Sequence, residues 1–279
     1  MRKKVWQLFI GLAIIFIACN NEETKSDSTQ NESSISSPQN ISYTVLNAFP
    51  HDTSSFTQGL EIYRGKLFES TGLYGKSSLR EIDLKSGKPK KIITNDKEIF
   101  AEGLTVLKDT IYQLSWENHL VFLYDAKTLS PIGTRAWNYQ GWGITNDGNS
   151  LLISDGTDKI YFAEPNTLKV KNIISVKDHI GPVNNLNELE MIDGFLYANR
   201  WQYEYILKID PNSGHVVGMI DFTDFLPKNS KADLSYLSKN NSTAQINGAV
   251  LNGIAYDSTK KTILITGKLW PEIFEVKLQ

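Results

Sequence analysis

Cysteine is almost absent from this chain of 279 residues, which contains a single one, Cys19. A disulfide within the chain is therefore excluded, and the folded part must be stabilised by its own hydrophobic core. A domain of this length buries enough apolar surface to do so. An excess of charge of either sign is also lacking, because the formal net charge is -2. This balance indicates neither nucleic acid nor an acidic membrane surface as a partner.

Several common catalytic signatures are missing as well. The sequence has no Gly-rich phosphate loop, nucleophile elbow or zinc-protease motif. Its four histidines are scattered, without a His-x-His or i, i+4 pair that would favour a zinc site. Asp155 with Asp158, and Glu188 with Glu190, are paired acids compatible with a cation or with glycosidase chemistry, although the segment from Asp155 to Asp158 also fits an ordinary hairpin turn. We expect no required cofactor, although a structural cation is possible.

Long apolar runs are limited to the N-terminus, where three basic residues precede residues 5–17. As a helix this run is about 20 Å long, too short to span a hydrocarbon core of roughly 30 Å. We interpret residues 1–18 as a signal peptide. Cys19 directly follows Ile-Ala, which resembles the lipobox of bacterial lipoproteins, so we expect Cys19 to carry lipid. Phe16 replaces the usual Leu of that motif, which leaves a plain secretory signal as the alternative.

The segment that follows is rich in Asn, Ser, Thr and Glu and has almost no apolar residues. Such a composition buries too little surface to offset chain entropy, so we predict a flexible tether over residues 19–40. The folded domain then occupies residues 41–279. We expect it to be an exported monomer, anchored by lipid to a bacterial membrane and facing the periplasm or the cell surface, without a nucleic-acid partner.

Five diverged copies of one unit fill the predicted domain. Most copies are spaced by about 40–50 residues, the length of a four-stranded propeller blade. Each begins with a turn into an apolar strand: Gln58-Gly59-Leu60, Glu102-Gly103-Leu104, Trp142-Gly143-Ile144, Asn187-Glu188-Leu189 and Asn252-Gly253-Ile254. Alternating strands separated by Gly, Asp or Asn turns follow at hairpin spacing. The sequence therefore predicts an all-β fold, a five-bladed β-propeller.

The two ends of the repeat array are complementary. The fifth copy stops one strand short, and an unpaired β-like run at residues 42–47 precedes the first copy. We expect this N-terminal strand to complete the last blade, because that arrangement removes an exposed edge. A polar insertion at residues 223–245 precedes the fifth copy. It is predicted to form a long loop or short helix over one face, either as a simple surface excursion or as a rim or lid.

Equivalent positions of all blades point at a common axis, so aligned copies define rings of residues. The first ring holds Gln58, Glu102, Trp142, Asn187 and Asn252, and the second holds Gly72, Trp116, Gly156, Trp201 and Lys268. Packing alone would place similar apolar residues at these positions. Tryptophan walls with a few convergent polar groups are instead typical of a ligand pocket. Phe56 and Phe100, each two residues before a first-ring residue, extend the predicted wall.

Glu102 is the most informative ring residue. A carboxylate surrounded by Trp and Phe is partly desolvated, which raises its pKa towards neutrality and suits it to proton transfer. Lys268 opposes this shift if it pairs with Glu102. The sequence leaves open which of the two effects on the pKa is larger.

Specific motifs extend over about residues 42–277. The most distinctive are Phe56-Thr57-Gln58-Gly59-Leu60, Ala101-Glu102-Gly103-Leu104-Thr105, Gly141-Trp142-Gly143, Leu186-Asn187-Glu188-Leu189-Glu190, Ala198-Asn199-Arg200-Trp201 and Thr266-Gly267-Lys268-Leu269-Trp270. Together these segments resemble the plant-type glutaminyl-peptide cyclotransferases, also called glutamine cyclotransferases. The resemblance implies a five-bladed propeller and an acyltransferase that converts N-terminal Gln of peptides to pyroglutamate and releases ammonia.

The resemblance also implies residue roles. Glu102 would be the catalytic proton shuttle. The substrate-binding residues would be Phe56, Gln58, Phe100, Trp116, Trp142, Asn187, Trp201 and Lys268. Two alternatives remain open: a non-catalytic cell-surface propeller that binds peptide or glycan in the same pocket, and hydrolysis of a lactone or glycoside by Glu188 and Glu190.

Overall fold

The computed structural model describes residues 35–234 and 249–279. The predicted signal peptide, Cys19 and the tether up to residue 34 lie outside the described residues, so the lipid anchor and the exported location stay predictions. Within the described ranges, no helix is both long and apolar enough to cross a membrane.

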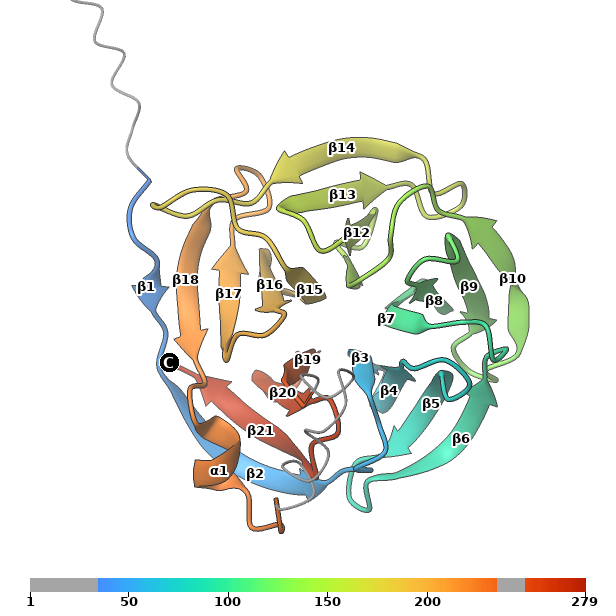
Figure 1. Cartoon of the computed structure of the whole chain (residues 1–279), viewed down its shortest axis with the longest axis horizontal. Helices are drawn as coiled ribbons and strands as arrows, with labels where there is room; N and C mark the ends of the chain where they lie inside the picture. Colours follow the sequence, from blue (N-terminus) through green and yellow to red (C-terminus); the bar gives the residue numbers. More distant parts are fainter. Residues whose placement is uncertain (1–34, 235–248) are drawn as a thin grey trace, which may run out of the picture. The chain divides into compact units, whose positions relative to one another are not determined.

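Five antiparallel sheets surround a common axis, which confirms the predicted five-bladed β-propeller (Figure 1). The first four blades consist of β3 (Thr57–Tyr63), β4 (Lys66–Thr71), β5 (Ser78–Asp83) and β6 (Lys88–Thr94); β7 (Ala101–Leu107), β8 (Thr110–Ser115), β9 (Leu120–Asp125) and β10 (Pro131–Ala136); β11 (Ile144–Asn146), β12 (Leu151–Ser154), β13 (Lys159–Ala163) and β14 (Val170–Ser175); and β15 (Leu186–Ile192), β16 (Phe195–Arg200), β17 (Tyr205–Ile209) and β18 (Val216–Asp221). In these four blades, the strands from β3 to β18 follow one another in chain order from the axis outwards.

The fifth blade closes the ring as predicted. It consists of β19 (Leu251–Asp257), β20 (Thr262–Gly267), β21 (Glu272–Leu278) and the N-terminal β2 (Tyr43–Pro50), which pairs antiparallel with β21. A short strand, β1 (Gln39–Asn40), lies parallel to β18 on the fourth blade. Two residues of the predicted tether therefore already belong to a sheet, and the chain joins the fourth and fifth blades before the first blade begins.

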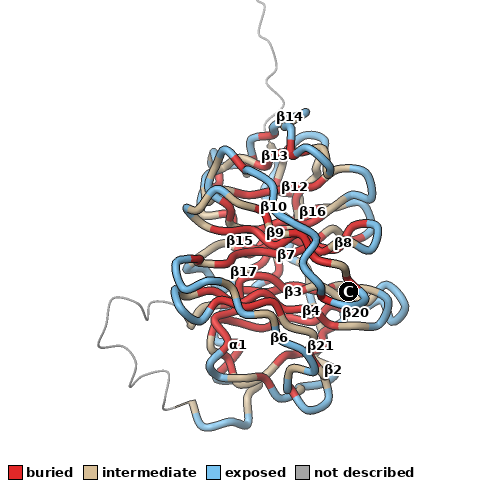
Figure 2. Tube along the Cα trace, turned by 90° about the vertical axis from the view of Figure 1, so that its right-hand side faces the viewer, coloured by how far each residue is buried: buried red, intermediate tan, exposed pale blue. Residues whose placement is uncertain are grey.

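The inner strands of the propeller carry most of its buried surface. All seven residues of β7 are buried, whereas β14 and β10 are largely exposed (Figure 2). Much of the hydrophobic core lies between neighbouring blades; for example, Phe68 and Leu79 of the first blade share a cluster with Leu104 and Ile111 of the second. Burial of each such side chain stabilises the fold by about 1.5–3 kcal/mol.

The predicted insertion contains a short helix, α1 (Phe225–Asn229), which confirms that part of the prediction. Its Phe225 packs edge-on against Phe274 of β21, with ring centres 4.9 Å apart, and lies against Tyr43 of β2. The helix therefore contributes to the core of the last blade. Residues 235–248 lie outside the described ranges, and a rim or lid role stays a prediction.

The glycine that follows most first-ring residues is required by close packing at the axis. A Cβ on Gly103 would lie 2.8 Å from the carbonyl oxygen of Trp142, and one on Gly143 would lie 1.9 Å from that of Asn187. Only a residue without a side chain permits such an approach between inner strands. The recurrent glycine of the repeat is therefore a packing requirement.

The fourth copy departs from this rule because it has Glu188 in place of glycine. The Glu188 carboxylate accepts the backbone N–H of Leu60 at 3.2 Å and that of Ile254 at 2.9 Å. It therefore binds β15 of the fourth blade to the inner strands of the first and fifth blades. This irregular copy serves to hold three blades together at the axis.

Candidate active site

Most polar residues of the first ring lie at β-bulges near the start of the inner strands. The register shifts between Thr57 and Gly59 in β3 and between Ala101 and Leu104 in β7. Similar shifts occur in β15 and β19, around Asn187 and Asn252. A bulge redirects the side chain that it contains. The bulges therefore explain why equivalent residues of different blades converge on the axis.

Second-ring residues follow the ends of the second strands and bind back to the start of the same blade. The backbone N–H of Gly72 donates to the carbonyl oxygen of Phe56 at 2.8 Å, and that of Trp116 donates to Phe100 at 2.9 Å. Lys268 donates in the same way to Val250 at 2.9 Å. These bonds place the two rings next to each other, as the aligned repeats predict.

A chain of three buried polar side chains connects the rings. The Nζ of Lys268 donates to the Oε1 of Gln58 at 2.5 Å, and the Nε2 of Gln58 donates to the Oε1 of Glu102 at 3.0 Å. All three residues are at most 5% exposed. No described residue donates a hydrogen bond to the second carboxylate oxygen of Glu102, which leaves that oxygen for a ligand.

Burial dominates the electrostatics of this chain. Desolvation raises the pKa of Glu102 well above its ordinary value, and the positive charge of Lys268 opposes the shift only in part. Burial likewise lowers the pKa of Lys268 to about 8, against the attraction of Glu102. Desolvation therefore affects the pKa of Glu102 more than the charge of Lys268 does. This answers the question that the sequence left open. Lys268 can therefore change protonation at about pH 8, and Glu102 holds its proton more tightly than an exposed carboxyl group does.

Aromatic rings surround this polar chain. The Lys268 ammonium lies 4.7 Å from the ring centre of Phe56. Phe100 packs edge-on against Phe56, Trp116 and Tyr74, with ring centres 6.1, 5.7 and 5.5 Å apart. Such edge-to-face contacts fix ring orientation as well as burying area. The predicted wall residues of the first and second blades therefore form one continuous surface.

The two glycines of the second ring make room for neighbouring side chains. A Cβ on Gly72 would lie 2.5 Å from the Phe100 ring and 3.1 Å from the Gln58 side chain. A Cβ on Gly156, whose φ is +82°, would lie 2.6 Å from the Trp142 ring. Their lack of a side chain therefore shapes the site.

Trp142 and Trp201 form a second aromatic group, with ring centres 5.8 Å apart. Gln140 connects this group to the first one, because its Oε1 accepts the indole N–H of both Trp116 and Trp142 at 3.1 Å. We did not predict Gln140 from the sequence. The signal was present, since Gln140 precedes Trp142 by the same two residues that separate Phe56 from Gln58.

Both asparagines of the first ring have a buried Oδ1 without a hydrogen-bond donor among the described residues. Asn252 donates to the carbonyl oxygen of Thr57 at 3.0 Å and so joins the fifth blade to the first. Asn187 is 2% exposed, and its Oδ1 has no hydrogen-bond donor among the described residues. A buried acceptor without a partner is costly, so each of these oxygens can accept a hydrogen bond from a further donor.

Glu188 and Glu190, the alternative acid pair, are engaged elsewhere. Glu190 accepts the backbone N–H of Tyr256 at 2.8 Å, as Glu188 does with those of Leu60 and Ile254. Burial raises the pKa of Glu190 well above its ordinary value, and the charges of Glu61 and Glu188 add to the shift. These contacts favour a structural role rather than hydrolytic chemistry.

Replacing Glu190 by Gln is expected to raise Tm at pH 8 by about 2–5 °C. A raised pKa means that the folded protein holds this proton more tightly than the unfolded chain does. The stabilisation is complete below about pH 4 and is lost as pH rises through the raised pKa. The amide keeps an acceptor for Tyr256 but never ionises, so the gain should vanish near pH 4.

Thermal unfolding of both proteins at the two pH values tests this expectation. Glu275→Gln is the matched control, because the pKa of Glu275 is lowered by hydrogen bonds from Asn47, Lys260 and Thr262 that outweigh its burial. This variant should lose stability at pH 8. An equal loss of Tm in Glu190→Gln at both pH values would contradict the assignment.

Metal binding receives no support from the described ranges. Within residues 35–234 and 249–279, no group of three or more His, Cys, Asp or Glu side chains is arranged to hold a metal ion. The expectation that no cofactor is required stays a prediction.

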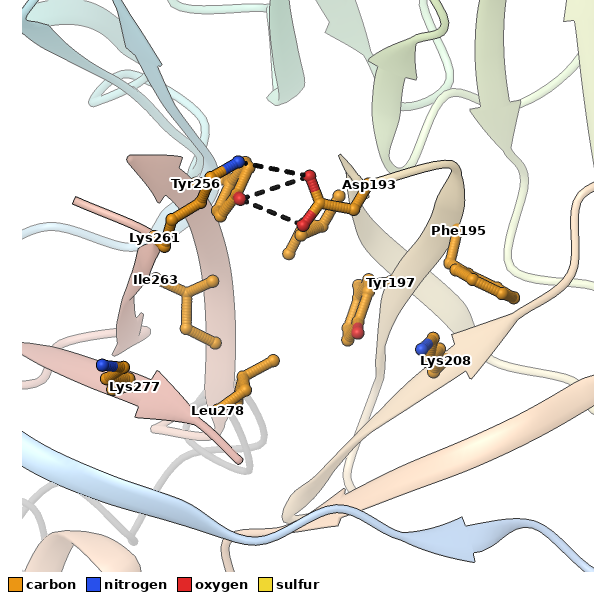
Figure 3. A pocket seen from close by; sticks show the side chains of 10 residues that line it. Asp193, Phe195, Tyr197, Lys208, Tyr256, Lys261, Ile263, Lys277 and Leu278 are labelled. Carbon is orange, nitrogen blue, oxygen red and sulfur yellow. Dashed lines mark hydrogen bonds and ion pairs between the residues drawn. The ribbon is translucent and has the colours of Figure 1, made fainter. Parts of the chain in front are cut away.

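One surface cavity of about 300 Å³ lies between the fourth and fifth blades (Figure 3). It is close to the turns after the inner strands, whereas the first ring is at the start of those strands. Its carboxylate, Asp193, accepts a hydrogen bond from the Tyr256 hydroxyl at 3.2 Å and pairs with Lys261 at 3.6 Å. With its acid neutralised, this cavity lacks the reactive group that the ring site has.

Comparisons with known proteins agree with the fold and with the family resemblance of the motifs. Residues 13–278 match the family model described as glutamine cyclotransferase. The chain is 41% identical over 239 residues to a glutaminyl-peptide cyclotransferase of Arabidopsis thaliana, covering 84% of this chain and 71% of the relative. It is also similar to the crystal structure of Myxococcus xanthus glutaminyl cyclase, with a TM-score of 0.75, 34% identity and coverage of 87% of this chain and 98% of that one.

The match extends over all five blades and includes both rings. A plant relative and a bacterial structure therefore support the same assignment as the motifs and the fold. The chain belongs to the glutamine cyclotransferase family and is an enzyme of the acyltransferase class.

Proposed function

We propose that this protein converts N-terminal glutaminyl residues of peptides to pyroglutamate with release of ammonia, and that Glu102 transfers the protons. The observation that carries the proposal is the buried chain from Lys268 through Gln58 to Glu102 within an aromatic wall. The names of the plant and bacterial relatives describe the same chemistry.

The reaction needs one proton to be removed and one to be supplied. The α-amine nitrogen attacks the γ-carbonyl carbon of its own side chain, the new N–C bond closes the ring, and the C–N bond to the former amide nitrogen breaks. The attacking amine loses a proton, and the departing nitrogen gains one and leaves as ammonia. A single buried carboxyl group whose pKa is raised well above its ordinary value can perform both transfers in turn.

The other site residues would hold the substrate in a reactive shape. Lys268 and Gln58 are positioned to bind the amide and the oxyanion that develops on its oxygen. The unpartnered Oδ1 of Asn187 would accept an N–H of the substrate. Trp116, Trp142 and Trp201 would keep the glutaminyl side chain folded for ring closure, which replaces an entropic cost of the reaction by binding energy.

Ammonia release from a Gln-initiated peptide is expected when the purified protein is supplied with it, accompanied by the loss of one NH₃ from the peptide mass. A peptide of the same composition with Gln in second place serves as the control, because its glutamine lacks a free α-amine. Binding of the Gln-initiated peptide without any change of mass would instead favour the non-catalytic propeller. The buried ionisable pair argues for the enzyme, since burial of charge is costly for simple binding.

A further inference from the structure

A second buried charged pair, His51 and Glu69, lies behind the polar chain of the site. The Nε2 of His51 is 2.9 Å from the Oε1 of Glu69, and both side chains are fully buried. His51 directly follows β2, the strand that completes the fifth blade, whereas Glu69 belongs to β4 of the first blade. The pair therefore joins the two blades at which the ring closes.

Both ring nitrogens of His51 face groups that accept hydrogen bonds. Nδ1 is 2.8 Å from the carbonyl oxygen of Trp270, which has no proton to donate. A neutral imidazole carries a single N–H and would satisfy only one of its two contacts with Trp270 and ionised Glu69. The geometry therefore fits an imidazolium that donates from both nitrogens.

Glu69 is surrounded by donors that favour its ionised form. Its carboxylate accepts the hydroxyl protons of Thr57 at 2.7 Å and Ser55 at 3.3 Å, and it lies 3.9 Å from Arg80. Arg80 in turn pairs with Asp52 at 3.0 Å. The charged groups that face His51 are thus Glu69, Asp52 and Arg80, and the cluster is neutral only when His51 is protonated.

The same pair contacts both segments that carry the Lys268–Gln58 hydrogen bond, the turn after β20 and strand β3. Trp270 lies two residues after Lys268, and the backbone N–H of Leu269 donates to the carbonyl oxygen of Ser55 at 2.7 Å. Thr57, which donates to Glu69, immediately precedes Gln58. His51 therefore holds the turn after Lys268, and Glu69 holds the strand of Gln58.

We propose that His51 and Glu69 are positioning residues whose charged pair sets the placement of Lys268 against Gln58, and that turnover depends on His51 keeping its proton. This inference rests on the proposed function for its effect on turnover. The charge state of the pair itself is independent of that function.

Electrostatics of the cluster agree with the geometry. Burial acts to lower the pKa of His51, but Glu69, the Trp270 carbonyl and Asp52 together outweigh it, so the pKa is raised. Burial acts to raise the pKa of Glu69, but His51, Arg80 and Thr57 lower it overall. Stability from His51 is complete below about pH 6.5 and is lost as pH rises through its raised pKa. Stability from Glu69 is lost as pH falls through its lowered pKa.

Nitrogen NMR of histidine-labelled protein tests the charge state without any substrate. We expect both ring nitrogens of His51 to show imidazolium shifts at pH 7, with the resonances assigned by their loss in His51→Gln. A signal of a neutral tautomer at that pH would overturn the proposal.

Kinetics of three variants test the positioning role. His51→Gln is expected to lower kcat for a Gln-initiated peptide by about 10- to 100-fold, because small displacements of reactive groups are costly. Glu69→Gln should also lower kcat, because a neutral amide cannot keep the second proton on His51. In this variant the loss of Tm with rising pH should also disappear.

Glu275→Gln is the matched control for these kinetics. Glu275 is buried on β21 and accepts hydrogen bonds from Asn47 of β2 and Thr262 of β20, so it stabilises the same closure. Its loss should lower Tm while kcat stays unchanged. Unchanged kcat in His51→Gln, or an equal fall of kcat in Glu275→Gln, would overturn the positioning role. If the unmodified protein has no activity, the proposed function fails and the NMR result still decides the charge state.

Discussion

Replacing Glu102 by Gln is expected to lower kcat by about 10²- to 10⁴-fold, the usual contribution of a positioned acid–base group. The amide retains the shape of the carboxyl group and can still accept from Gln58, but it can take no proton from the α-amine. Ammonia release from a Gln-initiated peptide measures the effect. Glu190 is also a buried acid, but it accepts a hydrogen bond from the backbone N–H of Tyr256 and has a structural role. Glu190→Gln should therefore keep normal kcat.

Stability should change in the opposite direction in the Glu102→Gln variant. Because the pKa of Glu102 is raised, its ionisation disfavours the folded state as pH rises from about 4 towards that pKa. The variant should therefore unfold at the same or a higher temperature at neutral pH, while its activity is lost. A variant with near-normal turnover would refute the role of Glu102, and a fall of Tm would indicate a structural role instead.

Regular features of the repeat made the fold predictable from the sequence. Strand alternation and turn residues recur in every copy, and the missing strand of the fifth copy required the closure that β2 provides. The two-residue strand β1 was not predictable, because its Gln39 and Asn40 are polar and exposed, and only the neighbouring β18 determines their pairing.

The candidate site was predictable where its residues occupy equivalent positions of the five aligned copies. Three residues from different blades are Gln58, Glu102 and Lys268. Their ring positions predicted that they lie together, and they form a hydrogen-bonded chain. His51 belongs to neither ring, so the alignment of the copies did not indicate it. Its contact with Trp270 joins residues from opposite ends of the domain sequence. The balance between desolvation and pairing at Glu102 also depends on three-dimensional burial, for which composition alone offers no measure.

Lys268 is the second residue whose loss should have a large effect. Replacing it by Met keeps a side chain of similar length against Phe56 but removes the ammonium group. The pKa of Glu102 should then rise further, because the Lys268 charge lowers it in the unmodified protein. A more strongly held proton makes Glu102 a weaker acceptor for the substrate proton, so kcat/KM should fall by about 10²-fold below pH 8, where Lys268 of the unmodified protein is charged. Lys260→Met, which removes a lysine that pairs with Glu275, is the control and should leave kcat/KM unchanged.

A pH profile separates the charge of Lys268 from its hydrogen bond to Gln58. With a pKa lowered to about 8, Lys268 loses its proton as pH rises through that value, and the unmodified protein then lacks the same charge as the variant. The α-amine of the substrate also titrates at about pH 8, but its ionisation is common to both proteins and cancels in their ratio. The ratio of their kcat/KM values should therefore shrink towards one above pH 8. A ratio that stays constant across this range would show that Lys268 acts through its hydrogen bond to Gln58 and not through its charge.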